Sequence, residues 1–282
     1  MTAAAPSVGV PPPRPGRGLS FARGVRHYAP AIAVFAGGIL LWELLVGGLD
    51  VRGFILPAPS AIGAALVENW GAGRWPLFEA ARTTLYEAIG GLVIGTSAGL
   101  IVAFAVSRWA NARDAVLPVA IAANAIPIIA IAPIFNAWFG ITNPLSKMMV
   151  AALLVFFPVM INVTRGLTQV DPAALELMRS YAASETTVLR KVRVPNALPF
   201  FFTAMKVATT LSLIGAIVGE YFGGSSIVIG RVVVQSASAL RFDVTWAAIL
   251  LGAVTGIVFY LIIVMLERVF IPWHASVRPE ST

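Results

Sequence analysis

Few residues in this 282-residue sequence have the chemistry of a catalytic or metal-binding site. It has two histidines, His27 and His274, no cysteine, and no H-E-x-x-H pair of the kind that holds zinc. No Gly-Lys pair occurs, so the phosphate-binding loop of a P-loop ATPase is missing. We therefore predict no catalytic residue, no metal site and no cofactor bound by this chain.

Ionisable side chains inside long apolar stretches are the remaining candidates. A charge at membrane depth is costly, so such a residue is a functional candidate by default. Glu43, Glu87, Lys206 and Glu220 lie within these stretches or near their ends. Each of them can instead reach the interface, cap a helix or pair with an opposite charge, and these alternatives stay open. We select Glu220 as a candidate contact along a translocation path.

One apolar stretch, residues 115–139, combines prolines with amide side chains. Proline interrupts helical hydrogen bonding, and broken helices are tolerated at membrane depth where the freed backbone groups face protein or a wet cavity. We therefore expect a discontinuous span beside the path, whose candidate residues are Asn124, Pro127, Pro133 and Asn136.

The composition identifies the class of protein that must position these residues. Apolar residues make up 58% of the chain and charged residues 12%, whereas soluble domains carry about 25% charged residues. A membrane-spanning helix needs about 20 mostly apolar residues. The predicted fold is an all-α polytopic membrane protein with about six transmembrane helices, at 29–49, 82–107, 115–139, 145–166, 197–222 and 244–267.

The distribution of basic residues predicts the orientation. With the N-terminus inside, 13 Lys and Arg residues are cytoplasmic, 6 are outside and Lys206 lies within the fifth span. Cytoplasmic loops carry the excess of positive charge, so we predict both termini in the cytoplasm. The net charge of +7 then reflects topology, and nothing else favours nucleic-acid binding. The predicted parts are a disordered, basic, proline-rich tail (1–27), a transmembrane domain (28–272) and a cytoplasmic tail (273–282).

The largest cytoplasmic loop, residues 171–195, is amphipathic. Asp171 followed by Pro172 is typical of a helix start, because Asp caps the first amides and proline fits the first helical position. Apolar residues then recur at helical spacing beside a basic face, and Pro195 and Pro199 are expected to break or bend the chain before the fifth span. On pattern alone, a helix lying on anionic lipid explains this loop equally well.

The loop resembles the EAA motif of permease subunits in ATP-binding-cassette (ABC) importers. That motif reads E-A-A, three residues, Gly, nine residues, then I-x-L-P. The same register is present in Glu176-Leu177-Met178, Ala182 and Val192-Arg193-Val194-Pro195, although two alanines and the glycine are replaced. The resemblance implies a coupling helix around residues 182–187 that docks on a separate ATPase, with a tip at residues 183–185. The implied coupling residues are Glu176, Arg179, Tyr181, Ala182, Ala183, Ser184, Glu185 and Pro195.

Other segments resemble the nitrate, sulfonate and taurine branch of these permeases. Leu56-Pro57-Ala58-Pro59-Ser60 is similar to its "LPSPS" segment, and Ile217-Val218-Gly219-Glu220-Tyr221-Phe222 is similar to the segment after its loop. Residues 179–184 and 191–199 look most like permeases for vitamin-type solutes, which are riboflavin or the hydroxymethylpyrimidine precursor of thiamin. The implied fold is that of a type I ABC importer permease in a bacterial cell membrane.

The resemblance also implies partners. They are two ABC ATPase subunits that bind ATP and magnesium, a second permease subunit, an extracytoplasmic substrate-binding protein and the surrounding membrane lipid. The second permease is a copy of this chain in a homodimer, the family's usual arrangement, and a heterodimer with a different permease stays open. The alternative is a secondary transporter or channel whose loop lies on the lipid surface. Inverted repeats, buried acid relays or a selectivity loop would favour that alternative, and none is visible in the sequence.

Overall fold

The computed structural model describes residues 17–71, 73–123, 127–225 and 227–272. The chain divides into two compact units, residues 1–60 and 61–282. In the first unit, helix α1 (Arg17–Gly48) begins within the segment predicted as a tail, and its residues 29–48 are long and apolar enough to cross a membrane. Glu43 of α1 accepts hydrogen bonds from the backbone N and the Oγ of Ser60, at 3.0 and 2.6 Å.

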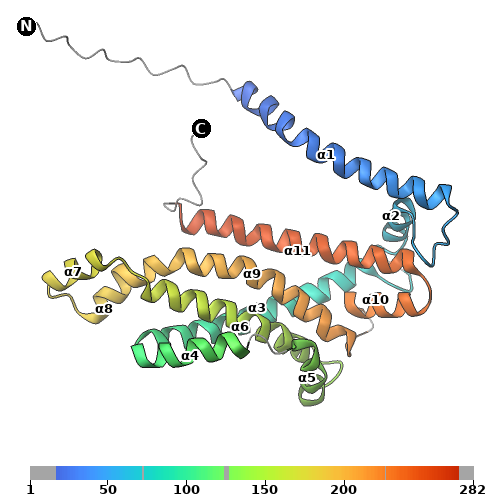
Figure 1. The fold of residues 1–282 in the computed structure, drawn as a ribbon. Coiled ribbons are helices and arrows are strands. Elements are labelled where there is room, and N and C mark those ends of the chain that lie inside the picture. Colours follow the sequence, from blue (N-terminus) through green and yellow to red (C-terminus); the bar gives the residue numbers. More distant parts are fainter. Residues whose placement is uncertain (1–16, 72, 124–126, 226, 273–282) are drawn as a thin grey trace, which may run out of the picture. The chain divides into compact units, whose positions relative to one another are not determined.

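The rest of the described chain is helical, with no strand among the described residues (Figure 1). Four of its helices are long and apolar enough to cross a membrane: α3 (Leu77–Ser107), α6 (Pro144–Thr168), α9 (Val194–Tyr221) and α11 (Phe242–Phe270). The shorter elements are α2 (Pro59–Glu68), α4 (Ala110–Ala123), η1 (Ile128–Ala130), α5 (Ala132–Phe139), α7 (Pro172–Ser180), α8 (Glu185–Val188), the π-helical η2 (Leu189–Arg193) and α10 (Ile229–Ser238). The predicted all-α polytopic fold is confirmed.

Helices α3, α6 and α9 form the centre of the second unit, and glycine lets them approach closely. A Cβ added at Gly95 would lie 2.4 Å from the carbonyl oxygen of Ala152, and one at Gly215 would lie 2.6 Å from the Cα of Ala151. These contacts join both α3 and α9 to the same stretch of α6. Small residues at four-residue spacing in the sequence thus serve helix packing.

The predicted third span is not one helix. The structure divides residues 115–139 into α4, the short η1 and α5, while Asn124 lies outside the described residues. The predicted discontinuity is therefore confirmed, and only residues 114–123 form a shorter apolar helix. Pro127 and Pro133 flank the break, as expected of residues without a backbone N–H.

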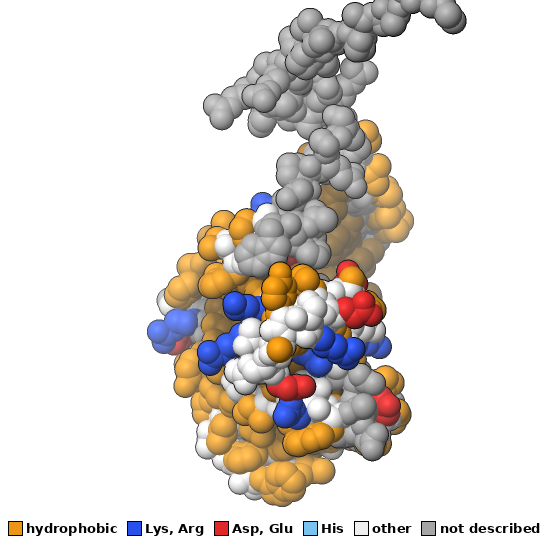
Figure 2. All heavy atoms as spheres, turned by 90° about the vertical axis from the view of Figure 1, so that its left-hand side faces the viewer, with side chains coloured by type: hydrophobic (Ala, Val, Ile, Leu, Met, Phe, Trp, Pro, Cys, Tyr) orange, Lys and Arg blue, Asp and Glu red, His pale blue; other side chains and the backbone are white. Residues whose placement is uncertain are grey.

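The two ends of the second unit have different characters. Helices α7 and α8 project from one end, while α5 and α10 lie at the other (Figure 1). Figure 2 looks onto the α7–α8 end, where blue Lys and Arg side chains surround the projecting loop. The exposed basic residues there are Arg108, Arg165, Arg179, Arg190 and Lys191. The positive-inside rule predicts that this end faces the cytoplasm and that the α10 end faces outward, and the two ends are named accordingly.

Candidate functional site

Helix α7 begins where the sequence predicts. The side chain of Asp171 accepts a hydrogen bond from the backbone N of Ala173 at 2.9 Å, and Pro172 occupies the first turn. An Asp cap and an N-terminal proline together satisfy or remove amides that would otherwise lack partners. The helix entering the loop therefore has a defined start.

The turn after α7 depends on Ala182. Its φ is +48°, in the left-handed region that favours glycine. The amide of Ala183 donates to the carbonyl of Met178 at 3.0 Å, and the amide of Ala182 donates to that of Arg179 at 2.9 Å. This pair of bonds is the Schellman pattern that ends a helix. The chain thus adopts a conformation that favours glycine at the position where the EAA motif has glycine, although it carries alanine there.

The segment after the turn joins the fifth span without an intervening loop. Ser184 accepts a hydrogen bond from the amide of Thr187 at 3.3 Å and so starts α8, which continues through η2 into α9. Pro195 lies in the first turn of α9, and the π-helical stretch comes directly before it. At Pro195 the expected break is a change of helix type, because proline lacks a backbone N–H and the wider π-helical turn accommodates the loss. Pro199 lies inside α9, which continues through it without a break.

The base of the loop is tied together by Asn196, which the sequence analysis did not select. Its Nδ2 donates to the carbonyls of Gly166 and Gln169 at 2.8 and 3.0 Å, and so joins the end of α6 to the start of α9. A Cβ at Gly166 would lie 2.8 Å from the Cα of Ala197, so the two helices are almost in backbone contact. Asn196 also satisfies carbonyls at a helix end that have no partner within the helix.

Arg108 links the loop to the second span. Its Nη1 lies 2.7 Å from Oε2 of Glu185, across 77 residues of sequence. The ion pair lies at a cleft of about 610 Å³ between α8 and the cytoplasmic ends of α3 and α6. Glu185 is therefore turned toward its own subunit, although its side chain remains 79% exposed.

The other predicted coupling residues lie on the exposed side of the loop. Tyr181 is 75% exposed, and Ala182 and Ser184 are also exposed, while Ala183 is half-buried. Glu176 and Arg179 are exposed on α7 and form no ion pair with each other within the described chain. The loop thus offers an apolar and aromatic surface, with Tyr181 beside Leu177, on a base held by Asn196 and Arg108.

Two of the path candidates lie in a buried polar cluster at the outer end. Asn136 of α5 accepts a hydrogen bond at 3.1 Å from the Nζ of Lys147, which also donates to Ser146 Oγ at 2.9 Å and to the carbonyl of Ile141. Lys147 is completely buried on α6. A buried ammonium needs such acceptors, so Lys147 holds α5 and the following turn against α6.

Glu220 is the other path candidate in this cluster. It is completely buried on α9, near Glu87 of α3, which is 2% exposed. Oε2 of Glu220 accepts a hydrogen bond from the amide of Gly230 at 2.6 Å. Pro127 and Pro133 are exposed instead. The structure therefore brings Asn136 and Glu220 into one packed cluster and leaves the two prolines outside it.

Lys206 of α9 forms an ion pair with Glu267 of α11. Its Nζ lies 3.1 and 3.0 Å from the two carboxylate oxygens of Glu267, which joins α9 to α11. The side chains are 24% and 9% exposed, respectively. Of the alternatives left open for Lys206, the structure shows pairing with a carboxylate.

Comparison with known proteins decides the family. The family described as "Binding-protein-dependent transport system inner membrane component" matches residues 91–273. The chain belongs to this family. It is therefore a permease subunit of an ABC importer for small solutes and a multi-pass protein of the bacterial inner membrane, and such permeases work with ATPase and substrate-binding partners. The matches do not support a secondary transporter or channel.

The permease also has close relatives over most of its length. A protein of Haemophilus influenzae assigned as an ABC transporter permease is 30% identical over 76% of this chain and 84% of its own. The riboflavin transport system permease of Chloroflexus aurantiacus is 28% identical, over 88% of this chain and 92% of its own. The formylaminopyrimidine transport permease of Halalkalibacterium halodurans is 29% identical, over 84% and 92%.

Proposed function

We propose that the loop of residues 171–195 is the docking site for the ATPase. The observation that carries this proposal is the combination of an exposed surface and a firm connection to the spans. Tyr181 and Leu177 are 75% and 56% exposed, whereas the helix that follows them runs directly into α9. A displacement of the loop is therefore passed to the fifth span, and such a link is what alternating access requires.

The energy source and the stoichiometry belong to the same proposal. Two copies of the permease form the path, two ATPases dock on their loops, and ATP with magnesium binds on those ATPases. The permease itself performs no catalysis. An extracytoplasmic binding protein delivers the solute at the α10 end, opposite the coupling loop.

The proposed solute is a nitrogen heteroaromatic vitamin or vitamin precursor. Two relatives that cover most of the chain are permeases for riboflavin and for formylaminopyrimidine, and both of these solutes are flat, nitrogen-containing rings. Sulfonate, taurine or nitrate is the second candidate class, suggested by the segments that resemble that branch. Uptake of labelled riboflavin and aminopyrimidine, measured against taurine in cells with and without the permease, separates the classes.

The docking site is tested by purification of the complex in mild detergent. A Tyr181→Ser, Leu177→Ser double variant should lose the ATPase while keeping its membrane level, because it removes the exposed apolar surface without touching Asn196 or Arg108. The matched control is Tyr86→Ser, which removes an exposed aromatic residue from the second span. Retention of the ATPase by the loop variant, at the level of the control, would contradict the assignment.

A further inference from the structure

The outer helix α10 has an N-terminus that its own residues do not cap. Its N-cap residue is Val228, which has no side-chain hydrogen-bonding group. The first amides of a helix have no partner within the helix, and leaving them buried and unpaired costs free energy. Ile229 and Gly230, the first two residues of α10, are both buried, so their amides need acceptors from elsewhere.

Two spans supply these acceptors. The amide of Ile229 donates to Oγ1 of Thr84 on α3 at 3.0 Å, and the amide of Gly230 donates to Oε2 of Glu220 on α9 at 2.6 Å. Thr84 and Glu220 are both completely buried. A carboxylate at a helix N-terminus also interacts favourably with the helix dipole. The start of α10 is thus capped by side chains from two other helices, Thr84 of α3 and Glu220 of α9.

The packing at Gly230 shows how closely α10 meets α9. A Cβ added there would lie 2.7 Å from the Cβ of Glu220 and 2.7 Å from the carbonyl oxygen of Ile217. Real Cβ atoms do not approach other atoms so closely, so any side chain at this position would push the amide away from its acceptor. Gly230 is therefore part of the same contact.

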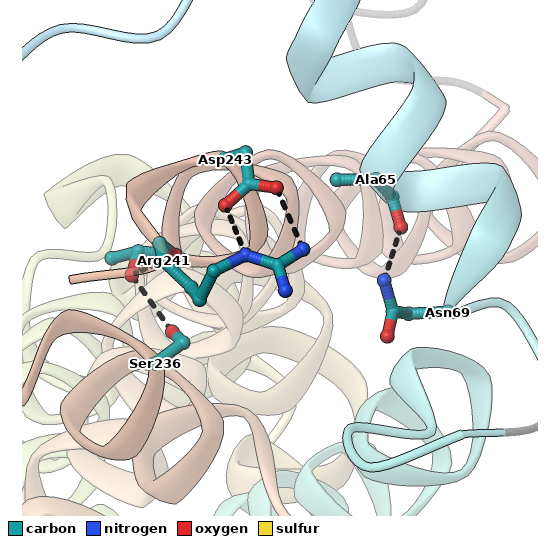
Figure 3. A network of polar contacts seen from close by, with 6 residues as sticks. Ala65, Asn69, Ser236, Arg241 and Asp243 are labelled. Atoms are coloured by element: carbon teal, nitrogen blue, oxygen red, sulfur yellow. Dashed lines mark hydrogen bonds and ion pairs between the residues drawn. The ribbon is translucent and has the colours of Figure 1, made fainter. Parts of the chain in front are cut away.

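The other end of α10 is tied to α11. Oγ of Ser236 lies 2.7 Å from Oγ1 of Thr245, and the amide of Arg241 donates to the carbonyl of Ser236 at 2.9 Å. Figure 3 shows this last bond, with the Arg241 guanidinium held by Asp243 at 3.1 and 2.9 Å. Three spans therefore hold α10: α3 and α9 at its start, and α11 at its end.

We infer that Glu220 and Thr84 are positioning residues that hold α10 across α3 and α9 at the outer end, and that solute uptake depends on this contact. The inference rests on the proposed function, since it assigns these residues a part in transport. It differs from the sequence prediction for Glu220, which was a direct contact along the path. If Glu220 contacts the solute directly, only its carboxylate matters for uptake. If it caps α10, then Thr84 of α3 and Gly230 of α10 matter as well.

The absence of cysteine makes a direct test possible, because an introduced cysteine is the only thiol on this subunit. Val232 is completely buried on α10, so a Val232→Cys residue reacts with a membrane-impermeant maleimide only when α10 separates from the bundle. The labelling rate then follows the open population. The measurement uses the assembled transporter in native membranes, with uptake recorded in the same samples.

Glu220→Ala should raise the labelling rate about 10-fold or more, because it leaves a buried amide without its acceptor. Thr84→Val, which replaces a neutral acceptor, should raise it about 3- to 10-fold. Gly230→Ala should also raise the labelling rate, because its Cβ displaces the amide from its acceptor. Solute uptake should fall in all three variants. Glu220→Gln keeps an acceptor oxygen, so its labelling rate and its uptake should stay closest to those of the parent protein.

Two control variants complete the design. Glu79→Ala removes an exposed carboxylate from the same end of α3 and should leave labelling unchanged. Ser238→Cys places an exposed thiol on α10 and should label at one rate in every background. If only the Glu220 variants lower uptake while labelling stays constant, the cap is refuted and Glu220 acts through its carboxylate alone. Unchanged labelling and uptake in Thr84→Val and Gly230→Ala also refutes it.

The failure of this inference can be told apart from failure of the proposed function. The same membranes are used to purify the subunit with its ATPase. If the parent subunit carries no ATPase, the proposed coupling fails, while the labelling rates still decide whether Thr84 and Glu220 hold α10. If the ATPase is retained throughout and labelling does not respond, the inference about α10 fails and the proposed function stands.

Discussion

Reversal of the Arg108–Glu185 pair separates two ways in which Glu185 can act. The resemblance to the EAA motif implies that Glu185 is part of the tip that contacts the ATPase. The structure places its carboxylate 2.7 Å from the guanidinium of Arg108, which indicates that it positions α8 relative to the second span. The informative variants are Arg108→Glu, Glu185→Arg and the two combined.

The geometry limits the expected size of the effect. The two side chains are 59% and 79% exposed, so solvent screens their attraction. Exposed ion pairs contribute about 0–1 kcal/mol, which corresponds to at most about a fivefold change in an equilibrium. Each single reversal places like charges together and should lower the stimulated rate of ATP hydrolysis by at most about fivefold. The double reversal restores an opposite-charge pair and should recover most of the loss.

The assay is ATP hydrolysis stimulated by the binding protein, measured on the reconstituted complex. The deficit of each single variant should shrink at about 1 M salt, where the Debye length is about 3 Å. A loss of far more than fivefold in Glu185→Arg that the double reversal does not recover would refute the reasoning. Glu185 would then contact the ATPase directly, and the bond to Arg108 would be incidental to coupling.

Three further predictions concern folding and can be measured by thermal unfolding in detergent. Ala182→Gly should stabilise the subunit by about 1 kcal/mol, because glycine adopts the φ of +48° without strain, whereas Ala182→Val should destabilise it and weaken retention of the ATPase. Gly95→Ala should cost about 1–3 kcal/mol, since its Cβ would lie 2.4 Å from a carbonyl oxygen of α6, while Gly63→Ala, with open space around it, should cost nothing. Glu267→Gln should cost about 3 kcal/mol by removing the negative charge that pairs with Lys206, and adding Lys206→Met should recover part of that loss; additive losses in this pair would contradict the ion-pair interpretation.

The features that sequence alone predicted are those encoded by local patterns. Asp171 and Pro172 start a helix because a cap and an N-terminal proline act within one turn. The long apolar stretches became the long helices, and Pro127 and Pro133 marked where the third stretch breaks, whereas Pro118 lies inside α4. The register of the EAA motif led to the correct family because spacing along the chain is itself a sequence property.

The features that were missed depend on side-chain contacts and turn hydrogen bonds that no local sequence pattern specifies. Thr84 and Ile229 are separated by 145 residues, and nothing near either one indicates that they meet. Lys147 is one of the six basic residues that the charge count placed outside, yet its three acceptors hold it completely buried. Ala182 adopts the left-handed conformation that favours glycine, and the hydrogen bonds of the turn, which the sequence does not reveal, maintain it.

The central claim is that the cytoplasmic loop meets a separate ATPase, and crosslinking tests it most directly. Because the permease has no cysteine, Tyr181→Cys places its only thiol on the exposed loop, and Ser238→Cys places it at the opposite end as a control. A short maleimide–photocrosslinker attached in native membranes should join the loop position to an ABC ATPase, identified by mass spectrometry, and should not do so from Ser238→Cys. Crosslinks from Tyr181→Cys to lipid alone, in membranes where the ATPase is present, would contradict the account.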